Sequence, residues 1–291
     1  MCVINLRGLG VALVTPFRQN LSIDFDSLEK ILDHVIEGGC DYIVALGTTA
    51  ETPTLSREEK ILLSDFIRQR VNGRVPLVIG IGGNNTARVV KNLLEGDLNG
   101  YSAVLSVAPY YNKPNQEGIF LHYKTIAEAS PLPVILYNVP SRTGVNITEK
   151  TALLLAEHPN IIGIKEASGN ICQIRGIIEK SPQDFYVISG DDSKTLDIVR
   201  CGGIGVISVL ANALPQQMKQ LVNLSLENKY DEAAKLQEHL KEITGYLFED
   251  GSPAGVKCAL SVLGLCENIL RLPLVPVSFS TTNKIKEVLK G

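Results

Sequence analysis

Eight short apolar segments, each followed by a stretch with helical periodicity, constrain the fold of this 291-residue chain more than any other sequence feature. The segments are nearly continuous apolar runs, as is typical of strands buried on both faces of a parallel sheet. Eight strand–helix units by about residue 226 predict a closed (β/α)8 TIM barrel of the α/β class. We expect the strands at residues 10–15, 42–46, 76–80, 103–107, 133–137, 161–165, 185–189 and 205–209.

The intervening segments carry helix signals. Ser56 and Glu59 have the spacing of a capping box at a helix start. Asp191 and Asp192 are expected to cap the helix that follows them rather than to form a catalytic pair. The expected helices are residues 26–37, 56–71, 86–94, 116–129, a helix capped by Thr148, residues 171–179 and 193–200, and a helix beyond Pro215.

Beyond the eighth unit the pattern changes to helices alone. Three helical segments, at about residues 230–247, 253–264 and 282–290, predict a C-terminal helical extension. We therefore divide the chain into a catalytic barrel, residues 1–226, and a C-terminal helical domain, residues 227–291. An open doubly wound sheet is the structural alternative. Its phosphate-binding fingerprint is incomplete, because residues 80–85 (GIGGNN) lack the third glycine.

The composition and charge argue against several classes of function. The net charge is −3, and no run of Lys and Arg interleaved with aromatic residues suggests a nucleic-acid surface. No apolar run reaches membrane-spanning length, and the first residues lack the pattern of a signal peptide. The six cysteines are scattered through apolar segments, as in a cytoplasmic protein with reduced thiols. The four histidines are isolated, so we expect no metal site.

The strand at residues 161–165 ends in Lys165, and lysine is rarely buried without a partner. The ordinary explanation is a side chain that extends its amine from the strand end to solvent. The alternative is an amine nucleophile, desolvated so that a useful fraction is neutral and can form a Schiff base with a carbonyl substrate. The residues at the other strand ends decide between these interpretations.

Active residues of a TIM barrel lie at the C-terminal ends of its strands. Tyr137 ends the strand beside that of Lys165, and its hydroxyl can move the protons that Schiff-base formation requires. Thr48 can relay a proton between tyrosines, and the backbone N–H groups of Thr48 and Thr49 can hold a carboxylate. Arg142 offers a bidentate guanidinium to a second carboxylate. Each residue also has an ordinary structural explanation, but chance is a poor account of all of them at one end of a barrel.

These motifs resemble those of the pyruvate-dependent class I aldolases and lyases, and within that superfamily the dihydrodipicolinate synthase family. The resemblance covers essentially the whole chain. Ala50 stands where the family usually has glycine, and we expect the change to alter only the flexibility of a turn. The superfamily motifs are residues 47–51 (GTTAE), residues 137–140 (YNVP) and Lys165, and the narrower motifs are residues 110–114 (YYNKP), 141–144 (SRTG) and 163–168 (GIKEAS).

The resemblance implies that the chain condenses pyruvate with L-aspartate 4-semialdehyde in the diaminopimelate and L-lysine pathway, with no metal or organic cofactor. Lys165 would form the imine with pyruvate, and Tyr137 would be the general acid and base. Thr48 and Tyr111 would complete the proton relay. The implied substrate-binding residues are Thr49 for the pyruvate carboxylate, Arg142 for the semialdehyde carboxylate, and Gly190 and Ile207, which would line the pocket through backbone groups.

The resemblance also implies a homotetramer, a dimer of tight dimers, in which Tyr111 reaches the neighbouring subunit's site. Inhibition by L-lysine would be weak or absent. Two residues near the lysine site of inhibited members, Asn84 and Tyr110, are retained. The glutamate and histidines that hold the ligand's charged groups in those members are matched here by Arg88, Arg57 and Lys60.

Two other functions stay open. A related lyase, such as N-acetylneuraminate lyase or a 2-keto-3-deoxy sugar acid aldolase, would share the chemistry at lysine and differ in its second substrate. Arg142 argues against it, because a carboxylated aldehyde calls for a cation there. A barrel without catalytic activity that acts as a regulator is also conceivable for any fold. The filled catalytic positions argue against that reading.

Overall fold

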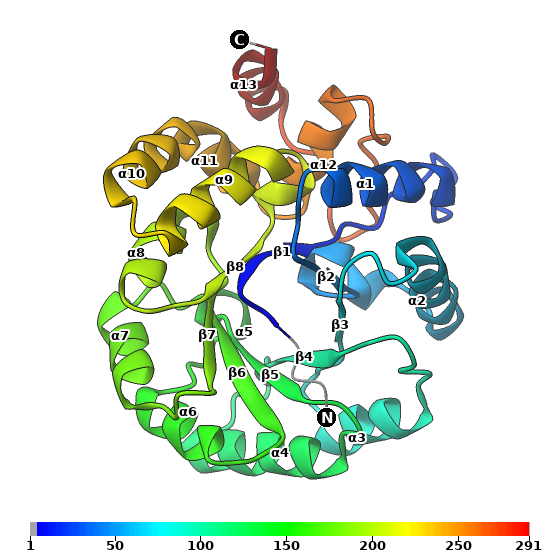
Figure 1. Ribbon diagram of the computed structural model, residues 1–291. Coiled ribbons are helices and arrows are strands. Elements are labelled where there is room, and N and C mark those ends of the chain that lie inside the picture. Colours follow the sequence, from blue (N-terminus) through cyan, green and yellow to red (C-terminus); the bar gives the residue numbers. More distant parts are fainter. Residues whose placement is uncertain (1–4, 291) are drawn as a thin grey trace.

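The computed structural model describes residues 5–290 and contains eight parallel strands closed into one barrel (Figure 1). Each strand pairs with its neighbours in the sequence, and the eighth pairs with the first. The prediction of a TIM barrel is therefore confirmed, and the open doubly wound sheet is wrong. The strands are β1 (Gly8–Ala12), β2 (Tyr42–Ala45), β3 (Leu77–Gly80), β4 (Ala103–Val107), β5 (Val134–Asn138), β6 (Ile161–Glu166), β7 (Tyr186–Ser189) and β8 (Gly205–Ser208).

Helices form a ring outside the strands (Figure 1). The predicted capping box opens the second helix, where the Glu59 N–H donates to Ser56 and the Glu59 carboxylate accepts from the Ser56 N–H. The outer helices are α1 (Phe25–Glu37), α2 (Arg57–Val71), α3 (Thr86–Glu95), α4 (Gln116–Ala129), α6 (Glu149–Ala156), α7 (Ile171–Lys180), α8 (Thr195–Arg200) and α9 (Pro215–Leu226).

Short helical turns follow several strands, at the end of the barrel where active residues are expected. They are α5 (Pro140–Thr143) and the 3-10 turns η1 (Thr48–Ala50), η2 (Thr52–Thr54), η3 (Asp192–Lys194) and η4 (Leu210–Asn212). The C-terminal segment forms α10 (Tyr230–His239), α11 (Lys241–Glu249), α12 (Ala254–Val262) and α13 (Phe279–Lys290). Its division from the barrel as a separate domain stays a prediction.

Several predicted elements have different bounds in the structure, and two of the differences have a local explanation. The first strand runs from Gly8 to Ala12 rather than over residues 10–15. It ends early because the Val14 N–H donates to Asn212 Oδ1, at 3.1 Å, instead of continuing the ladder with β8. The segment predicted as one helix at residues 230–247 is two helices that meet at Leu240. Leu240 is buried, so the apolar pattern continues across the break and the sequence does not reveal it.

The interior of the barrel is filled by side chains. Tyr42, Leu105, Ile188 and Ile207 belong to one buried cluster, whereas a second and larger cluster lies between the strands and the outer helices. Because the barrel is a packed core and not a pore, a substrate can bind only at its mouth.

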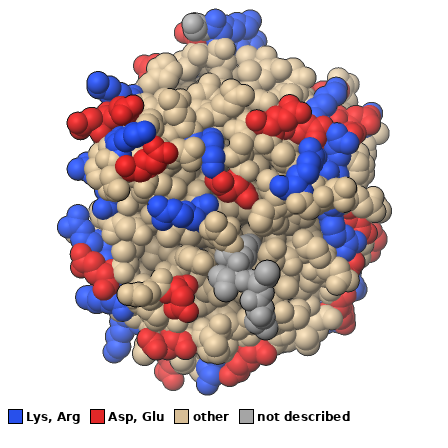
Figure 2. Space-filling model, viewed as in Figure 1, with Lys and Arg blue, Asp and Glu red and all other residues tan. Residues whose placement is uncertain are grey.

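The surface in view carries charges of both signs. Lys and Arg alternate with Asp and Glu, and neither sign forms a continuous patch on this face (Figure 2). Within residues 5–290 no helix combines the length and apolar character needed to cross a bilayer. The prediction about a signal peptide rests partly on residues 1–4, which lie outside the described residues.

Candidate active site

Lys165 lies near the C-terminal end of β6 and is 5% exposed. Its register partners are Tyr137 on β5 and Ile188 on β7. The Lys165 Nζ lies 4.4 Å from the centroid of the Tyr137 ring. The ion pairs found among residues 5–290 do not include this amine. A buried amine that no carboxylate holds is available to attack a carbonyl group.

Space beside this lysine depends on a glycine. A Cβ atom on Gly190 would lie 3.0 Å from Cε and 3.1 Å from Cγ of Lys165, and 2.8 Å from the Cβ of Ala167. Any side chain at position 190 would therefore displace the lysine or the strand end. Ile207 on β8 is 1% exposed and belongs to the cluster inside the barrel. The structure thus places Gly190 in contact with Lys165. It places Ile207 in the packed interior below the mouth.

The turn after β2 presents backbone donors. Its first backbone hydrogen bonds are donated by Ala50 to Gly47 O, at 3.2 Å, and by Glu51 to Thr48 O, at 3.1 Å. The N–H groups of Thr48 and Thr49 precede these bonds and so have no partner within the turn. In a ring of eight strands β2 stands opposite β6, so this turn faces Lys165 across the mouth. Such a pair of N–H groups can bind a carboxylate.

Arg142 lies at the rim on α5, a one-turn helix that runs from Pro140 to Thr143 and is capped by Gly144. Its side chain is exposed, and Nη2 donates to the carbonyl oxygen of Ser252 at 3.1 Å. This single bond to the C-terminal segment leaves the other guanidinium N–H groups able to bind a carboxylate. The position fits a contact with a substrate entering from solvent.

Tyr111 is exposed to solvent, unlike the buried Tyr137 and Lys165. It is 88% exposed on the loop between β4 and α4, where its backbone has a φ of 71°. Among residues 5–290 no hydrogen bond joins Tyr137 to Thr48 or Tyr111. The proton relay therefore stays a prediction.

Sequence reasoning missed a buried polar network behind the site. Asn138 and Glu166 are register partners, one residue beyond Tyr137 and Lys165, and so lie on the other face of the sheet. The Asn138 Nδ2 donates to both Glu166 oxygens at 3.1 Å, and the Ile147 N–H donates to Asn138 Oδ1 at 2.9 Å. This network ties the loop that carries Arg142 to the strand of the lysine.

Burial raises the pKa of Glu166, while hydrogen bonds from Asn138, Ser168 and Gln173 oppose the rise. The network binds the carboxyl group through neutral donors alone. The sequence did contain a signal for this network. Asn138 and Glu166 are polar residues that directly follow the catalytic candidates Tyr137 and Lys165, and the alternation of side chains along a strand turns them to the outward face.

The prediction for the aspartate pair is half right. Asp191 caps the turn as predicted, since its Oδ1 accepts from the Ser193 N–H at 2.9 Å. The prediction is wrong for Asp192, which is buried and whose Oδ2 accepts from the N–H groups of Val209 at 3.0 Å and Leu210 at 2.9 Å. It joins the ends of β7 and β8 because the burial of this turn leaves no solvent to bind those donors. Burial raises the pKa of Asp192.

No group of three His, Cys, Asp or Glu side chains within residues 5–290 has the arrangement of a metal site. The reactive groups that the mouth does offer are an amine, a phenol, a guanidinium and backbone N–H donors. These can hold two carboxylates around a carbonyl carbon and carry protons to and from it.

Known proteins similar to this chain share its whole length. The model of the dihydrodipicolinate synthetase family matches residues 5–291. A 4-hydroxy-tetrahydrodipicolinate synthase of Parabacteroides distasonis is 51% identical over 291 residues, which span 100% of this chain and 98% of that protein.

Solved structures of dihydrodipicolinate synthases have nearly the same fold as this chain. The dihydrodipicolinate synthase of Thermotoga maritima has a TM-score of 0.95 and 39% identity, covering 98% of this chain and 97% of that one. The enzyme of Acinetobacter baumannii, solved in complex with pyruvate, has a TM-score of 0.95 and 39% identity, covering 98% of each chain.

Proposed function

The chain belongs to the dihydrodipicolinate synthetase family, and from this premise we propose that it is the lyase that condenses pyruvate with L-aspartate 4-semialdehyde. The product is 4-hydroxy-tetrahydrodipicolinate, on the route to diaminopimelate and L-lysine. The observation that carries the proposal is the position of Lys165. Its amine is buried at the mouth of the barrel, against Tyr137 and beside a glycine that leaves room for an adduct.

The first step is imine formation at Lys165. The amine attacks C2 of pyruvate, and the resulting carbinolamine loses water to give the imine. The N–H groups of Thr48 and Thr49 bind the pyruvate carboxylate from the opposite side of the mouth, which holds C2 towards the lysine. Gly190 and Ile207 line the pocket below. The electron-withdrawing imine makes the methyl group of pyruvate acidic, and loss of one proton gives an enamine.

Proton transfer in these steps is the role of Tyr137. Its hydroxyl donates a proton to the departing water and accepts one as the imine forms. Thr48 and Tyr111 complete the relay, with Tyr111 supplied by the neighbouring subunit. The 88% exposure of Tyr111 supports this assignment, because a side chain that points away from its own subunit can reach another.

The second substrate binds at the rim. Arg142 binds the carboxylate of L-aspartate 4-semialdehyde with the guanidinium N–H groups that Ser252 leaves free. The enamine carbon attacks the aldehyde carbon, and the aldehyde oxygen takes a proton to become the 4-hydroxyl group. The amine of the semialdehyde then attacks C2 of the imine and closes the ring, which releases the Lys165 amine.

The assembly that suits this site is a homotetramer made of two tight dimers, located in the cytoplasm. The exposed Tyr111 supports the dimer, since a complete relay requires a second copy of the chain. Scattered cysteines without close pairing support a reducing compartment.

An assay with alternative aldehydes tests the reaction. Initial rates are measured with pyruvate and either L-aspartate 4-semialdehyde or sugar-derived aldehydes, with an Arg142→Ala variant beside the unaltered protein. We expect turnover with the semialdehyde and, in the variant, a raised KM for the semialdehyde with little change in that for pyruvate. Preferred turnover of a sugar-derived aldehyde would refute the assignment of the second substrate.

A further inference from the structure

A buried ion pair lies behind the turn that faces Lys165. Glu51 follows η1, and its side chain is fully buried, as is that of Lys257 on α12. The Lys257 amine pairs with Glu51 Oε1, and the Arg271 N–H donates to Glu51 Oε2 at 3.0 Å. Lys257 also donates to Ile269 O at 2.8 Å. Both Glu51 oxygens are therefore held by groups of the C-terminal segment.

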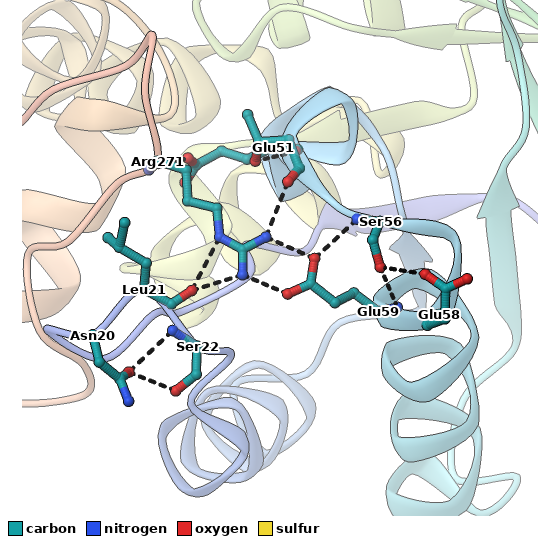
Figure 3. Close-up of polar contacts among 9 residues, drawn as sticks. Asn20, Leu21, Ser22, Glu51, Ser56, Glu58, Glu59 and Arg271 are labelled. Atoms are coloured by element: carbon teal, nitrogen blue, oxygen red, sulfur yellow. Dashed lines mark hydrogen bonds and ion pairs between the residues drawn. The ribbon is translucent and has the colours of Figure 1, made fainter.

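Arg271 of the C-terminal segment also binds residues around the turn (Figure 3). The Arg271 guanidinium pairs with Glu59, with Nη1 at 2.7 Å and Nη2 at 2.5 Å from its two oxygens. It also donates to the carbonyl oxygens of Leu21, at 2.6 and 3.1 Å, and of Thr54, at 3.0 Å. The loops after β1 and β2 are thus joined to the chain beyond α12 by one side chain.

The turn itself has a backbone that needs support. Glu51 has φ 52° and ψ 34°, the left-handed region that residues other than glycine rarely adopt. The Thr52 hydroxyl donates to Gly47 O at 2.8 Å, and the Thr54 hydroxyl donates to Glu51 O at 2.9 Å. The buried carboxylate of Glu51 is the point at which this strained turn is fixed to the rest of the molecule.

Stability alone is a weak reason for such a pair. Desolvation of two buried charges offsets most of their attraction, so that apolar side chains of similar volume often serve as well. Burial lowers the pKa of Lys257, and the attraction of the Glu51 carboxylate opposes this change. Desolvation and charge attraction therefore act against each other at this pair. Unlike an apolar contact, the ion pair fixes the orientation of the Glu51 carboxylate, because each of its oxygens accepts a hydrogen bond from one donor.

We propose that Lys257, acting through Glu51, is a positioning residue that fixes the N–H groups of Thr48 and Thr49 to receive the carboxylate of the keto acid. This inference rests on the proposed function, in which those donors bind pyruvate. It makes the C-terminal segment part of the substrate-binding apparatus, although Lys257 and Glu51 touch no substrate. A shift of the turn would weaken pyruvate binding more than the chemistry at Lys165.

Trapping of pyruvate by borohydride measures this effect without the aldehyde. The variants are Lys257→Met, Glu51→Gln and the double variant, which removes both charges and leaves no buried charge unpaired. We expect the pyruvate concentration for half-maximal trapping to rise about tenfold or more, since small misplacements of a binding group have effects of this order. The kcat at saturating pyruvate should fall less than the pyruvate KM rises.

Lys219→Met is the matched control. Lys219 pairs with Asp41 at 2.7 Å, just before β2 and so at the opposite end of the strand that leads to Glu51. This variant loses an ion pair to the same strand and should keep half-maximal trapping within about twofold of the unaltered protein. Circular dichroism confirms that each variant is folded, and the double variant serves if Lys257→Met is not.

The outcomes separate the two proposals. Half-maximal trapping within about twofold of the unaltered value in a folded Glu51 or Lys257 variant would overturn the positioning role. An equal rise in the Lys219→Met control would overturn it as well, since the effect would then be one of stability. If the unaltered protein traps pyruvate but does not turn over the semialdehyde, the proposed reaction fails and the positioning role is still measured.

Discussion

Tyr137 and Lys165 face each other because they are register partners on adjacent strands, with side chains on the same side of the sheet. The variant Tyr137→Phe keeps the ring against the lysine and removes only the hydroxyl. We expect kcat to fall about 100- to 1,000-fold, the usual size of a general acid–base contribution, with little change in thermal stability. Steady-state kinetics and a thermal melt provide the check. A kcat within about threefold of the unaltered value would assign proton transfer to another group.

Among single residues, the sequence identifies those at the strand ends whose side chains point into the barrel. It misses the next residue along each strand, whose side chain points outward. Lys165 and Tyr137 stand out because a polar group at the end of an apolar run is unusual. Asn138 and Glu166 have the same property but lie on the other face, where they bind each other across two strands and Asn138 also binds the Ile147 N–H of the following loop. Local sequence is enough to predict a cap at Asp192, whereas its partners Val209 and Leu210 are 17 and 18 residues away.

At the scale of elements, the start of α2 depends on one carboxylate with two roles. Glu59 completes the capping box with Ser56 and pairs with Arg271. The hydrogen bonds from the Arg271 guanidinium lower the pKa of Glu59 from 4.5 to about 2. Because the pKa is lower in the folded state, the stabilisation is fully present above the unfolded value and is lost as the pH falls towards 2.

Glu59→Gln tests this linkage. We expect the variant to lose about 1–2 kcal/mol of unfolding free energy at neutral pH, after allowance for solvent screening of a partly exposed pair. The difference from the unaltered protein should shrink as the pH falls from 4.5 towards 2. Urea unfolding at a series of pH values gives the measurement, and Glu117→Gln, at an exposed position in the first turn of α4, is the control. A difference that is constant over this pH range would contradict the assignment.

The long elements were predictable, and the short ones were not. Eight strands and the helices between them follow from apolar periodicity. The turns that carry the proposed binding groups, η1 and α5, have three and four residues, which is too short for any periodicity to show. The shift of β1 has a similar cause, since the side chain of Asn212 on η4, far along the chain, replaces the ladder at Val14.

At the scale of the whole molecule, we predict that Tyr111 serves the site of a second subunit. Mixing inactive Tyr111→Phe subunits with inactive Lys165→Ala subunits after dissociation should restore activity in hybrid dimers. One site of each hybrid then has an intact lysine and receives an intact tyrosine from its neighbour. Activity of the purified heterodimer is the measurement. If verified heterodimers stay inactive, Tyr111 serves the site of its own subunit.

The response to L-lysine is a further prediction at this scale. Arg88 lies close enough to Lys60 to add to the effect of burial, and both lower the pKa of Lys60. Arg57 is partly neutralised by Glu95, at 3.2 Å. If L-lysine binds where the family resemblance implies, these cations would repel its ammonium groups by about 1 kcal/mol for each close pair. We expect weak or no inhibition in initial-rate assays. Strong inhibition well below millimolar L-lysine would be the contrary result.

The link between the C-terminal segment and the barrel could not be read from the sequence. Lys257 and Glu51 are 206 residues apart, and neither periodicity nor spacing relates them. Helical patterns predict the C-terminal helices themselves, but only the folded chain shows that Lys257 and Arg271 reach the turn before α2.

The proposed function depends on the claim that Lys165 forms the imine with pyruvate. The protein is incubated with pyruvate, reduced with sodium borohydride, digested and analysed by peptide mass spectrometry, with Lys165→Ala as the control. We predict a lactyl-sized mass increase on the peptide that contains Lys165, absent from the variant and from protein reduced without pyruvate. An adduct on another lysine, or no adduct in protein that turns over its substrates, would contradict the claim.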